Sequence, residues 1–356
     1  MMENLVSNWF DGGILPDSYV LPPEKRPGKL IFPVAKMIPV IDFENHDRRS
    51  TIHQILEACQ DYGLFQVVNH GVPRDLMDET MNVMKKFHEM PTKDKASECS
   101  KDPERSCRFY TSSENYTSEK VHYWRDAVIH HCDPLDDYMQ FWPENPTAYR
   151  EVVGQFTIAV RKLASLILDL IGEGLGFNPG HFGGEYSKKP MLLVNHYPPC
   201  PDPSLTLGLA KHCDPSVITI ILQGDVPGLQ VFYDEEWFVV EPLAHAFVVN
   251  LGYILQIMSN GKLKGAVHRV VTSSTVARTT ASLFIYPSED SVIEPQTALV
   301  NASNPPLYRA FLYKHFSTKY ISATADAKTV EQFILKTSTD DHDGHGDVDD
   351  NLDLTK

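Results

Sequence analysis

The stretch His212-Cys213-Asp214, together with a second histidine, His268, in the apolar run 265–271 (GAVHRVV), decides how this chain is organised. Successive side chains of a strand point to opposite faces, so His212 and Asp214 are expected to face one metal ion while Cys213 points away. The third ligand would then come from another strand, where His268 lies. Two imidazoles and one carboxylate can occupy one face of a six-coordinate ferrous ion and leave the opposite face open for O2 and a co-substrate.

A histidine and an aspartate two residues apart are weak evidence alone, because a surface turn before Pro215 would explain them equally well. Arg278 strengthens the metal interpretation, since it follows His268 by ten residues and precedes Thr279 and Thr280. A guanidinium group is a planar fork that binds a carboxylate through two hydrogen bonds. The sequence therefore predicts a metal site beside a subsite for a chelating dicarboxylic co-substrate.

Several ordered motifs make the chain resemble the plant 2-oxoglutarate/Fe(II)-dependent dioxygenases from about Pro39 to about Tyr320. Beside the metal and arginine residues, the motifs are 39–43 (PVIDF), 63–71 (GLFQVVNHG), 195–201 (NHYPPCP), 212–215 (HCDP), 227–231 (PGLQV) and 249–252 (VNLG). Within the family, the sequence is most similar to hydroxylases of specialised metabolism, of the hyoscyamine 6-beta-hydroxylase, salicylate and flavonoid types.

The resemblance implies an α+β fold, with a double-stranded β-helix (jelly roll) core and flanking helices as in isopenicillin N synthase. It also implies an oxidoreductase that uses Fe(2+), 2-oxoglutarate and O2, with ascorbate as the reductant. The implied metal ligands are His212, Asp214 and His268. Arg278, Thr280 and Tyr197 would bind the distal carboxylate of 2-oxoglutarate, with Asn195 close to the metal.

The expected substrate is a small plant specialised metabolite, an alkaloid or a phenolic, hydroxylated with release of succinate and CO2. Its predicted contacts are aromatic: Phe284, Tyr110, Phe109 and Phe311. Three alternatives stay open: a desaturase, demethylase or ring-closing oxidase on the same scaffold, an oxidase that uses no 2-oxoglutarate, and a jelly roll that only binds a small molecule.

The sequence departs from the family pattern at five positions. Thr280, in the co-substrate subsite, replaces the usual serine and keeps its hydroxyl. The other four positions are expected near the substrate pocket. His196 stands at a position where many relatives carry an aromatic residue, and Tyr253 where many carry an acidic one. Lys211 and Cys213 flank His212 in place of the more usual residues. These departures bear on the substrate and not on the reaction class.

The order of elements along the chain predicts helices first and a closed β unit later. Apolar spacing predicts helices at 49–62, 73–90, 149–175 and 308–320, and short strands at 39–43, 64–68, 191–197, 217–222, 229–233, 237–240, 247–250, 267–271 and 282–286. Between them, 91–123 is polar and irregular, which is typical of a lid loop. We expect an N-terminal region (1–188) packed on the catalytic core (189–322), and a disordered acidic tail (339–356).

Composition excludes several classes of partner. The formal net charge is −15, with 42% hydrophobic and 22% charged residues, so a nucleic acid or an anionic membrane surface is not expected to bind. No stretch approaches the ~20 apolar residues of a membrane span, and residues 1–13 lack an apolar signal-peptide run. The six cysteines are scattered without a CxxC pair, which favours reduced thiols in the cytoplasm. We expect a cytoplasmic monomer.

Overall fold

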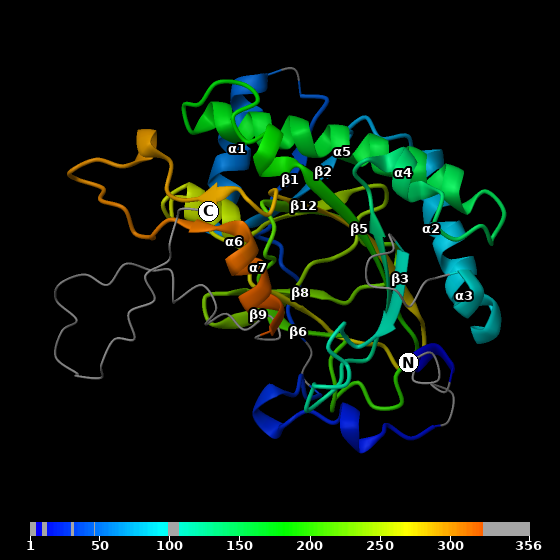
Figure 1. Cartoon of the computed structure of the whole chain (residues 1–356). Helices are drawn as coiled ribbons and strands as arrows, with labels where there is room; N and C mark the ends of the chain where they lie inside the picture. The colour runs from blue at the N-terminus through cyan, green and yellow to red at the C-terminus, as the bar shows by residue number, and fades with distance from the viewer. Residues whose placement is uncertain (1–4, 9–12, 30–31, 46, 99–106, 323–356) are drawn as a thin grey trace.

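The computed structural model describes residues 5–8, 13–29, 32–45, 47–98 and 107–322. The predicted acidic tail, 339–356, lies outside the described residues. Two β-sheets and a group of helices account for most of the described chain (Figure 1).

The larger sheet has eight strands that come from both halves of the chain. In spatial order they are β1 (Val40–Asp42), β2 (Leu64–Val68), β10 (Phe247–Leu251), β7 (Ile218–Leu222), β12 (Arg278–Tyr286), β5 (Lys189–Tyr197), β4 (Asp126–His131) and β3 (Cys107–Thr111). β1 and β2 pair in parallel, and the other neighbours pair antiparallel. Because β4 pairs with β5, the predicted boundary at residue 188 falls within one continuous sheet.

The smaller sheet has four strands, in the order β6 (Leu209–His212), β11 (His268–Val270), β8 (Leu229–Tyr233) and β9 (Glu236–Val239). From β5 to β12 the chain passes back and forth between the two sheets, with β5, β7, β10 and β12 in one and β6, β8, β9 and β11 in the other. This alternation is the double-stranded β-helix, and the predicted fold class is confirmed. A separate two-stranded sheet joins β13 (Val292–Ile293) to β14 (Phe311–Leu312).

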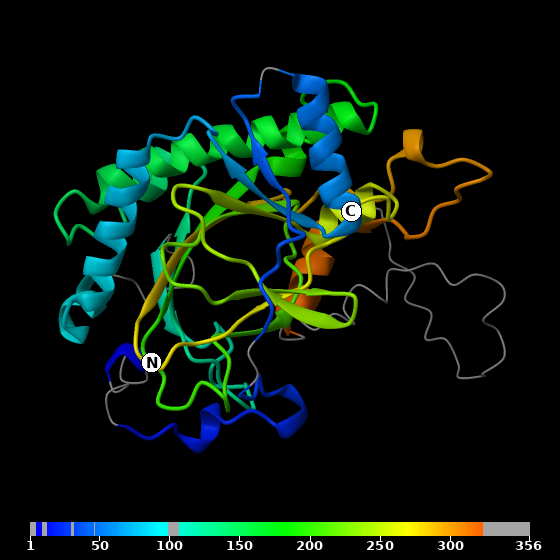
Figure 2. The same cartoon turned by 180° about the vertical axis from the view of Figure 1, so that it is seen from behind.

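Three long helices cover the outer face of the larger sheet: α1 (Arg48–Asp61), α2 (Arg74–Glu89) and α5 (Tyr149–Gly174) (Figures 1 and 2). The Asp47 side chain accepts hydrogen bonds from the backbone N–H groups of Arg49 and Ser50, which caps the start of α1. α5 ends before Gly176, whose φ of +88° lies in the left-handed region that favours glycine. The three helices bury their apolar faces against the sheet in one hydrophobic core.

The remaining helices are shorter. They are α3 (Thr92–Glu98), α4 (Leu135–Met139), α6 (Tyr253–Met258) and α7 (Tyr313–Ser322), with 3-10 turns η2 (Val6–Asn8), η4 (Asp17–Tyr19), η5 (Pro23–Lys25), η6 (Gly184–Ser187) and η7 (Thr297–Leu299). None of the helices in the described ranges is both long and apolar enough to cross a membrane.

Strand alternation in β12 and β5 separates the core from the interior of the jelly roll. On β12, Ala281, Leu283 and Ile285 pack into the core beneath the helices, while Arg278, Thr280, Ser282 and Phe284 face the interior. On β5, Leu192 and Val194 face the helices, while Leu193, Asn195 and Tyr197 face inward. Two adjacent strands therefore give the jelly roll a polar inner wall.

The long helices and most strands lie where the sequence predicts them, and four features differ. The stretch 91–123, predicted to be irregular, contains α3 and, within the larger sheet, β3. The strands β4, β6, β13 and β14 and the helices α4 and α6 were not predicted. β12 begins at Arg278 and not at Ser282, and α7 begins at Tyr313 and not at Tyr308. At the start of β12, the polar residues Arg278 and Thr280 face the interior site, so an apolar pattern does not mark this part of the strand.

Candidate metal centre

The three predicted metal ligands converge at one end of the smaller sheet. His212 is the last residue of β6, His268 is the first residue of β11, and the two pair directly across the antiparallel ladder. Their Nε2 atoms lie 3.4 Å and 3.7 Å from Oδ1 of Asp214. The candidate ligand atoms of the three residues all lie within 4.8 Å of one another, and all three residues are buried.

The prediction of how Asp214 reaches the site is wrong in one respect. Asp214 is not a strand residue, because β6 ends at His212 and the chain turns at the bend 215–217. Cys213 still points into the core, so His212 and Asp214 face the same side, as expected, although only His212 lies in the strand. The turn is fixed by the Asp214 carbonyl, which accepts a hydrogen bond from the backbone N–H of Tyr253 at 2.9 Å.

Both imidazoles are oriented by the backbone of their own strand. His212 Nδ1 lies 2.8 Å from the Ala210 carbonyl oxygen, and His268 Nδ1 lies 2.9 Å from the Ala266 carbonyl oxygen. A carbonyl oxygen only accepts, so each Nδ1 carries the proton and each Nε2 presents its lone pair. Fixing the tautomer through the second ring nitrogen is the usual support for a metal-binding histidine.

The electrostatics of Asp214 also suit a bound cation. Burial acts to raise the pKa of Asp214, but the positive charge that His268 and His212 carry when they are protonated outweighs it and lowers the pKa to about 2. Burial, with the nearby His212, lowers the pKa of His268 to about 4. Oδ2 of Asp214 is buried and has no hydrogen-bond partner among the described residues. An ionised carboxylate with a free oxygen beside two neutral imidazoles is a donor set that fits ferrous iron.

A small cavity continues from the triad along the inner wall. Its lining includes the triad and all four residues predicted to contact the co-substrate: Asn195, Tyr197, Arg278 and Thr280. Register explains the grouping, because Arg278 pairs with Tyr197 and Thr280 pairs with Asn195 across β12 and β5. The sequence thus predicted which residues come together, and the structure brings all of them to one cavity.

Arg278 is held firmly at the far end of this cavity. Its guanidinium is buried and donates from Nε to the Val226 carbonyl at 3.0 Å and from Nη2 to Oε1 of Gln223 at 3.3 Å. The guanidinium carbon lies 5.5 Å from the centre of the Tyr197 ring. Gly228 allows the close approach, since a Cβ atom there would lie 2.8 Å from Cδ of Arg278. A buried cation that keeps donor capacity free requires an anion, such as a carboxylate.

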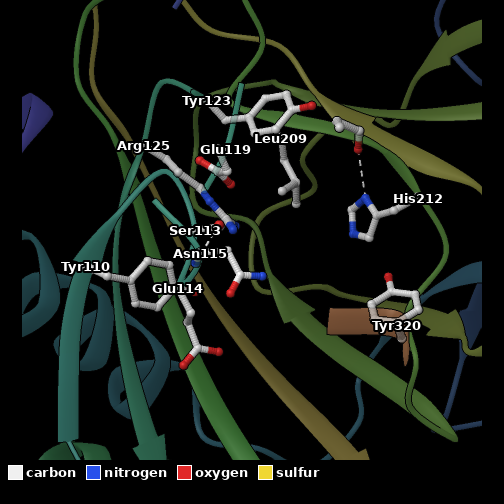
Figure 3. Close-up of a pocket in the computed structure, with 11 residues that line it drawn as sticks. Tyr110, Ser113, Glu114, Asn115, Glu119, Tyr123, Arg125, Leu209, His212 and Tyr320 are labelled. Atoms are coloured by element: carbon white, nitrogen blue, oxygen red, sulfur yellow. Dashed lines mark hydrogen bonds between the residues drawn. The ribbon is translucent and has the colours of Figure 1, made fainter. Parts of the chain in front are cut away.

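A larger cavity of about 570 Å³ opens from the metal site on the other side, towards β3, β4 and α7. His212 and Asp214 form part of its wall, so a molecule inside it would contact the metal centre directly. Six aromatic residues contribute to the remaining wall, which also contains charged residues: Tyr110, Tyr138, Phe284, Tyr286, Tyr313 and Tyr320. Figure 3 shows Arg125, Glu114 and Asn115 beside Tyr110, Tyr320 and His212 in the adjoining part of this space.

Two of the four predicted substrate contacts lie on this cavity and two do not. Phe284 lines both this cavity and the co-substrate cavity, and Tyr110 lines the larger one. Phe109 is the neighbour of Tyr110 on β3 and therefore points to the opposite face, where it packs against Phe87. Phe311 is 1% exposed and packs against Phe316 in the core. Phe109 and Phe311 therefore support the fold and do not face the cavity.

The four departures expected near the substrate lie away from both cavities. His196 faces the helices, where it stacks on His88 with ring centroids 4.6 Å apart. Lys211 lies over the Phe232 ring on the smaller sheet, with Nζ 3.7 Å from its centre. Cys213 and Tyr253 are buried in the core. The expectation that these positions lie near the substrate is wrong, because each side chain faces away from the jelly-roll interior.

Sequence analysis did not single out Arg125, which lies between the two cavities. It is buried, lines the larger cavity and donates a hydrogen bond from Nη1 to Oδ1 of Asn195 at 2.9 Å. The only signal in the sequence is a basic residue beside Trp124 and Asp126, which has no metal-ligand or helical spacing to mark it.

Comparison with known proteins agrees with this geometry. The sequence profile of the 2OG-Fe(II) oxygenase superfamily matches residues 188–287, and that of the non-haem dioxygenase in morphine synthesis N-terminal region matches residues 38–145. Hyoscyamine 6-dioxygenase of Hyoscyamus niger is 43% identical over 336 residues, covering 91% of this chain and 96% of that protein. Flavanone 3-dioxygenase 2 of Oryza sativa subsp. japonica is 36% identical, covering 88% and 92%.

Solved structures show the same fold. The crystal structure of JOX2 in complex with 2OG, Fe and JA superposes with a TM-score of 0.80 at 33% identity, covering 91% of this chain and 95% of that one. A rice dioxygenase for auxin oxidation (DAO) superposes with a TM-score of 0.72 at 22% identity, covering 84% and 100%. These likenesses extend over nearly all of the described chain.

Proposed function

The chain belongs to the 2OG-Fe(II) oxygenase superfamily, whose members are oxidoreductases dependent on Fe(II) and 2-oxoglutarate, and we propose that it hydroxylates one carbon of a small plant specialised metabolite, an alkaloid or a phenolic. The observation that carries the proposal is the cavity of about 570 Å³, with six aromatic residues in its wall, that opens directly on His212 and Asp214. Such a volume accommodates a ring-containing small molecule, and the charged residues of the wall, which include Arg125 and Glu114, offer it polar contacts. Hyoscyamine 6-dioxygenase and flavanone 3-dioxygenase 2 support the proposal by similarity.

In this proposal, His212, Asp214 and His268 hold the iron, with Nε2, a carboxylate oxygen and Nε2 as the donor atoms. Arg278 binds the distal carboxylate of 2-oxoglutarate, because its guanidinium is buried at the end of the cavity and turned towards it. The hydroxyls of Thr280 and Tyr197 supply further hydrogen bonds to the same carboxylate. The extra methyl of Thr280, relative to serine, narrows this end of the cavity.

Iron with 2-oxoglutarate and O2 supplies the oxidising chemistry, in which one oxygen atom enters succinate and the other enters the C–H bond of the substrate while CO2 is released. The residues of the chain position the reactants. The two cavities meet at the triad, so the co-substrate and the substrate reach the metal from different sides. A substrate bound in the larger cavity would have one C–H bond held near the metal.

The test is to incubate the iron-loaded protein with a panel of alkaloids and phenolics and 2-oxoglutarate. Succinate release and O2 uptake are then followed together with the mass of the product. A product one oxygen heavier than the substrate, formed in step with succinate, is the expected result. Absence of substrate-dependent succinate release from either chemical class would reject this substrate proposal.

The same measurement separates the alternatives on the scaffold. Desaturation or ring closure would give a product two hydrogens lighter, and demethylation would release formaldehyde. An oxidase that uses no 2-oxoglutarate would consume O2 without succinate. The buried Arg278 beside the triad favours 2-oxoglutarate, because a buried cation without an anionic partner is costly.

We further propose a cytoplasmic monomer with ascorbate as reductant. The described cysteines, which include Cys59, Cys107, Cys132, Cys200 and Cys213, are all free and buried, as expected for a chain that needs no disulfides. Light scattering on the purified protein would test the oligomeric state, imaging of a tagged chain would test the compartment, and turnover with and without ascorbate would test the reductant.

A further inference from the structure

Arg125 lies at the point where the substrate cavity and the co-substrate cavity approach each other. It precedes β4 and faces the jelly-roll interior, as do Ala127 and Ile129 two and four residues later. Its side chain is 7% exposed, and it lines the substrate cavity beside Leu209 and His212. Figure 3 shows the guanidinium pointing into this space.

The guanidinium is held on two sides. Nε donates to the Ser112 carbonyl at 2.8 Å, and Nη1 donates to Oδ1 of Asn195 at 2.9 Å. The backbone of Arg125 is fixed as well, because its carbonyl accepts hydrogen bonds from Ser112 N–H at 2.9 Å and from Thr111 Oγ1 at 3.1 Å. Ser112 adopts a φ of +59°, so the chain turns there to close the segment between β3 and β4. These contacts leave the guanidinium little freedom to move.

The contact with Arg125 determines which way the amide of Asn195 points. A guanidinium carries only donors, so the amide must present Oδ1 to Arg125 and its NH2 group elsewhere. Asn195 lines the co-substrate cavity together with the triad. Because Oδ1 is engaged by Arg125, Nδ2 is the amide atom left to donate to a ligand in the cavity, and the oxygens of 2-oxoglutarate only accept.

We propose that Arg125 is a positioning residue for the co-substrate, which fixes the amide of Asn195 so that Nδ2 donates a hydrogen bond to an oxygen of 2-oxoglutarate. The inference rests on the proposed function of the cavity as the 2-oxoglutarate site. It adds that Arg125, a residue in the wall of the substrate cavity, influences the binding of the co-substrate. A substrate that displaces the Arg125 guanidinium would loosen the Asn195 amide and the co-substrate with it.

The experiment measures 2-oxoglutarate affinity by titration calorimetry on full-length protein loaded with Mn(II) under anaerobic conditions, so that no turnover occurs. Arg125→Met removes every donor and should weaken binding by about tenfold, the order expected for loss of one hydrogen bond to a charged ligand. Arg125→Lys keeps one cationic donor and should restore part of the affinity. Arg108→Met is the matched control, because Arg108 lines the same cavity but pairs with Glu114 and should leave the affinity unchanged.

Asn195 variants distinguish positioning from a merely structural role. In Asn195→Ala, the further change Arg125→Met should have no effect on 2-oxoglutarate affinity beyond about twofold, because the coupled contact is already absent. Asn195→Asp keeps an acceptor for Arg125 but replaces the Nδ2 donor by an oxygen. It should fold stably, as judged by its Tm, and bind 2-oxoglutarate more weakly than Asn195→Ala.

Two results would overturn the inference. One is unchanged 2-oxoglutarate affinity in Arg125→Met. The other is equal weakening by Arg125→Met with and without Asn195, which would mean that the effect does not pass through the amide. If Arg125→Met does not fold, normal affinity in Asn195→Asp would reject the inference. Failure of the proposed function has a different signature, since Arg278→Lys would then leave 2-oxoglutarate binding unchanged.

Discussion

His212 and His268 are cross-strand partners on β6 and β11, and their ring centroids lie 4.1 Å apart. Directly opposed side chains of an antiparallel pair are the closest contacts that two strands offer. The β-ladder therefore fixes the separation of the two imidazoles before any metal binds. Asp214 completes the set from just beyond the end of β6, and its carboxylate lies close to both Nε2 atoms.

This relationship gives a first prediction on metal binding. His212→Ala, Asp214→Ala and His268→Ala should each abolish turnover, because each removes one of three ligands, while the protein stays folded. In the parent protein, added Mn(II) should raise the Tm, since a ligand that binds only the folded state stabilises it. The rise should be lost in all three variants. A variant that keeps both the metal-dependent Tm and normal turnover would show that its residue is not a ligand.

A second prediction concerns the distal carboxylate of 2-oxoglutarate. Arg278→Lys keeps the positive charge but loses the planar guanidinium that can donate two hydrogen bonds to one carboxylate. The KM for 2-oxoglutarate should therefore rise by about tenfold or more. Kinetics at saturating substrate would measure it. An unchanged KM would remove Arg278 from the co-substrate site.

Gly228 offers a third and more indirect test of the same subsite. A Cβ atom at this position would lie 2.8 Å from Cδ of Arg278 and 3.1 Å from the Val271 carbonyl oxygen. Gly228→Ala should therefore displace the Arg278 side chain and raise the KM for 2-oxoglutarate, with little change in metal affinity. The control is Gly71→Ser on the surface, where a Cβ atom has open space, although its φ of +82° will cost some stability. Equal kinetics in Gly228→Ala and the parent protein would show that Arg278 is not held as tightly as its contacts indicate.

The metal ligands His212 and Asp214 and the role of Arg278 were predictable from residue type and spacing, because side chains two residues apart in a strand share a face and a guanidinium binds a carboxylate. Thr280, Tyr197 and Asn195 were predicted from the resemblance to the dioxygenase family, because no local pattern assigns them to the co-substrate. The end of β6 at His212 was not predictable, since it is set by the bend that follows and not by side-chain alternation. Arg125 was missed for another reason: its role depends on Asn195, seventy positions away, and no local pattern links the two.

The residues that line the substrate cavity were also only partly predictable from the sequence. Phe109 and Tyr110 were both predicted contacts, because 91–123 has no apolar alternation that reveals a strand or its inner face. Only the pairing of β3 with β4 assigns Tyr110 to the cavity and Phe109 to the core. The aromatic residues of α7 and β12 that line the cavity are likewise of the same types as residues of the core. Aromatic character alone therefore could not show which residues face the cavity.

The neighbouring pair on β3 provides a fourth prediction. Tyr110→Ala should weaken binding of the substrate found in the metabolite panel by ~1–3 kcal/mol, with a smaller effect on Tm. Phe109→Ala should instead destabilise the fold by ~3–5 kcal/mol, because it leaves a void in the core against Phe87. Substrate affinity and denaturant unfolding, measured on both variants, check the contrast. If Phe109→Ala changed affinity more than stability, the assignment of the two faces of β3 would be wrong.

The last prediction concerns the N-terminal segment, which is tied to a buried carboxylate beside Arg125. Backbone N–H groups of Val6 and Ser7 donate to the two oxygens of Asp126 at 3.0 Å and 2.8 Å. Burial raises the pKa of Asp126, and the hydrogen bonds from Ser7 and Val6 act against that rise. Deleting residues 1–8 removes these donors, so the pKa of Asp126 in the folded state should rise further.

The sign of the pH dependence follows from that shift. A carboxyl whose pKa is higher in the folded than in the unfolded state binds an extra proton when folded, so its contribution to stability is lost as the pH rises through the folded-state pKa. The deletion should therefore lower the free energy of unfolding more at pH 8 than at pH 5, by ~1–3 kcal/mol, because the buried charge loses hydrogen-bond donors. Denaturant unfolding at both pH values measures the difference.

The matched control is the double variant Leu5→Ala with Val6→Ala. It keeps both N–H groups and removes only apolar burial, so its loss of stability should be the same at the two pH values. A deletion whose cost is equally independent of pH would show that the segment stabilises the fold through its apolar side chains and not through Asp126.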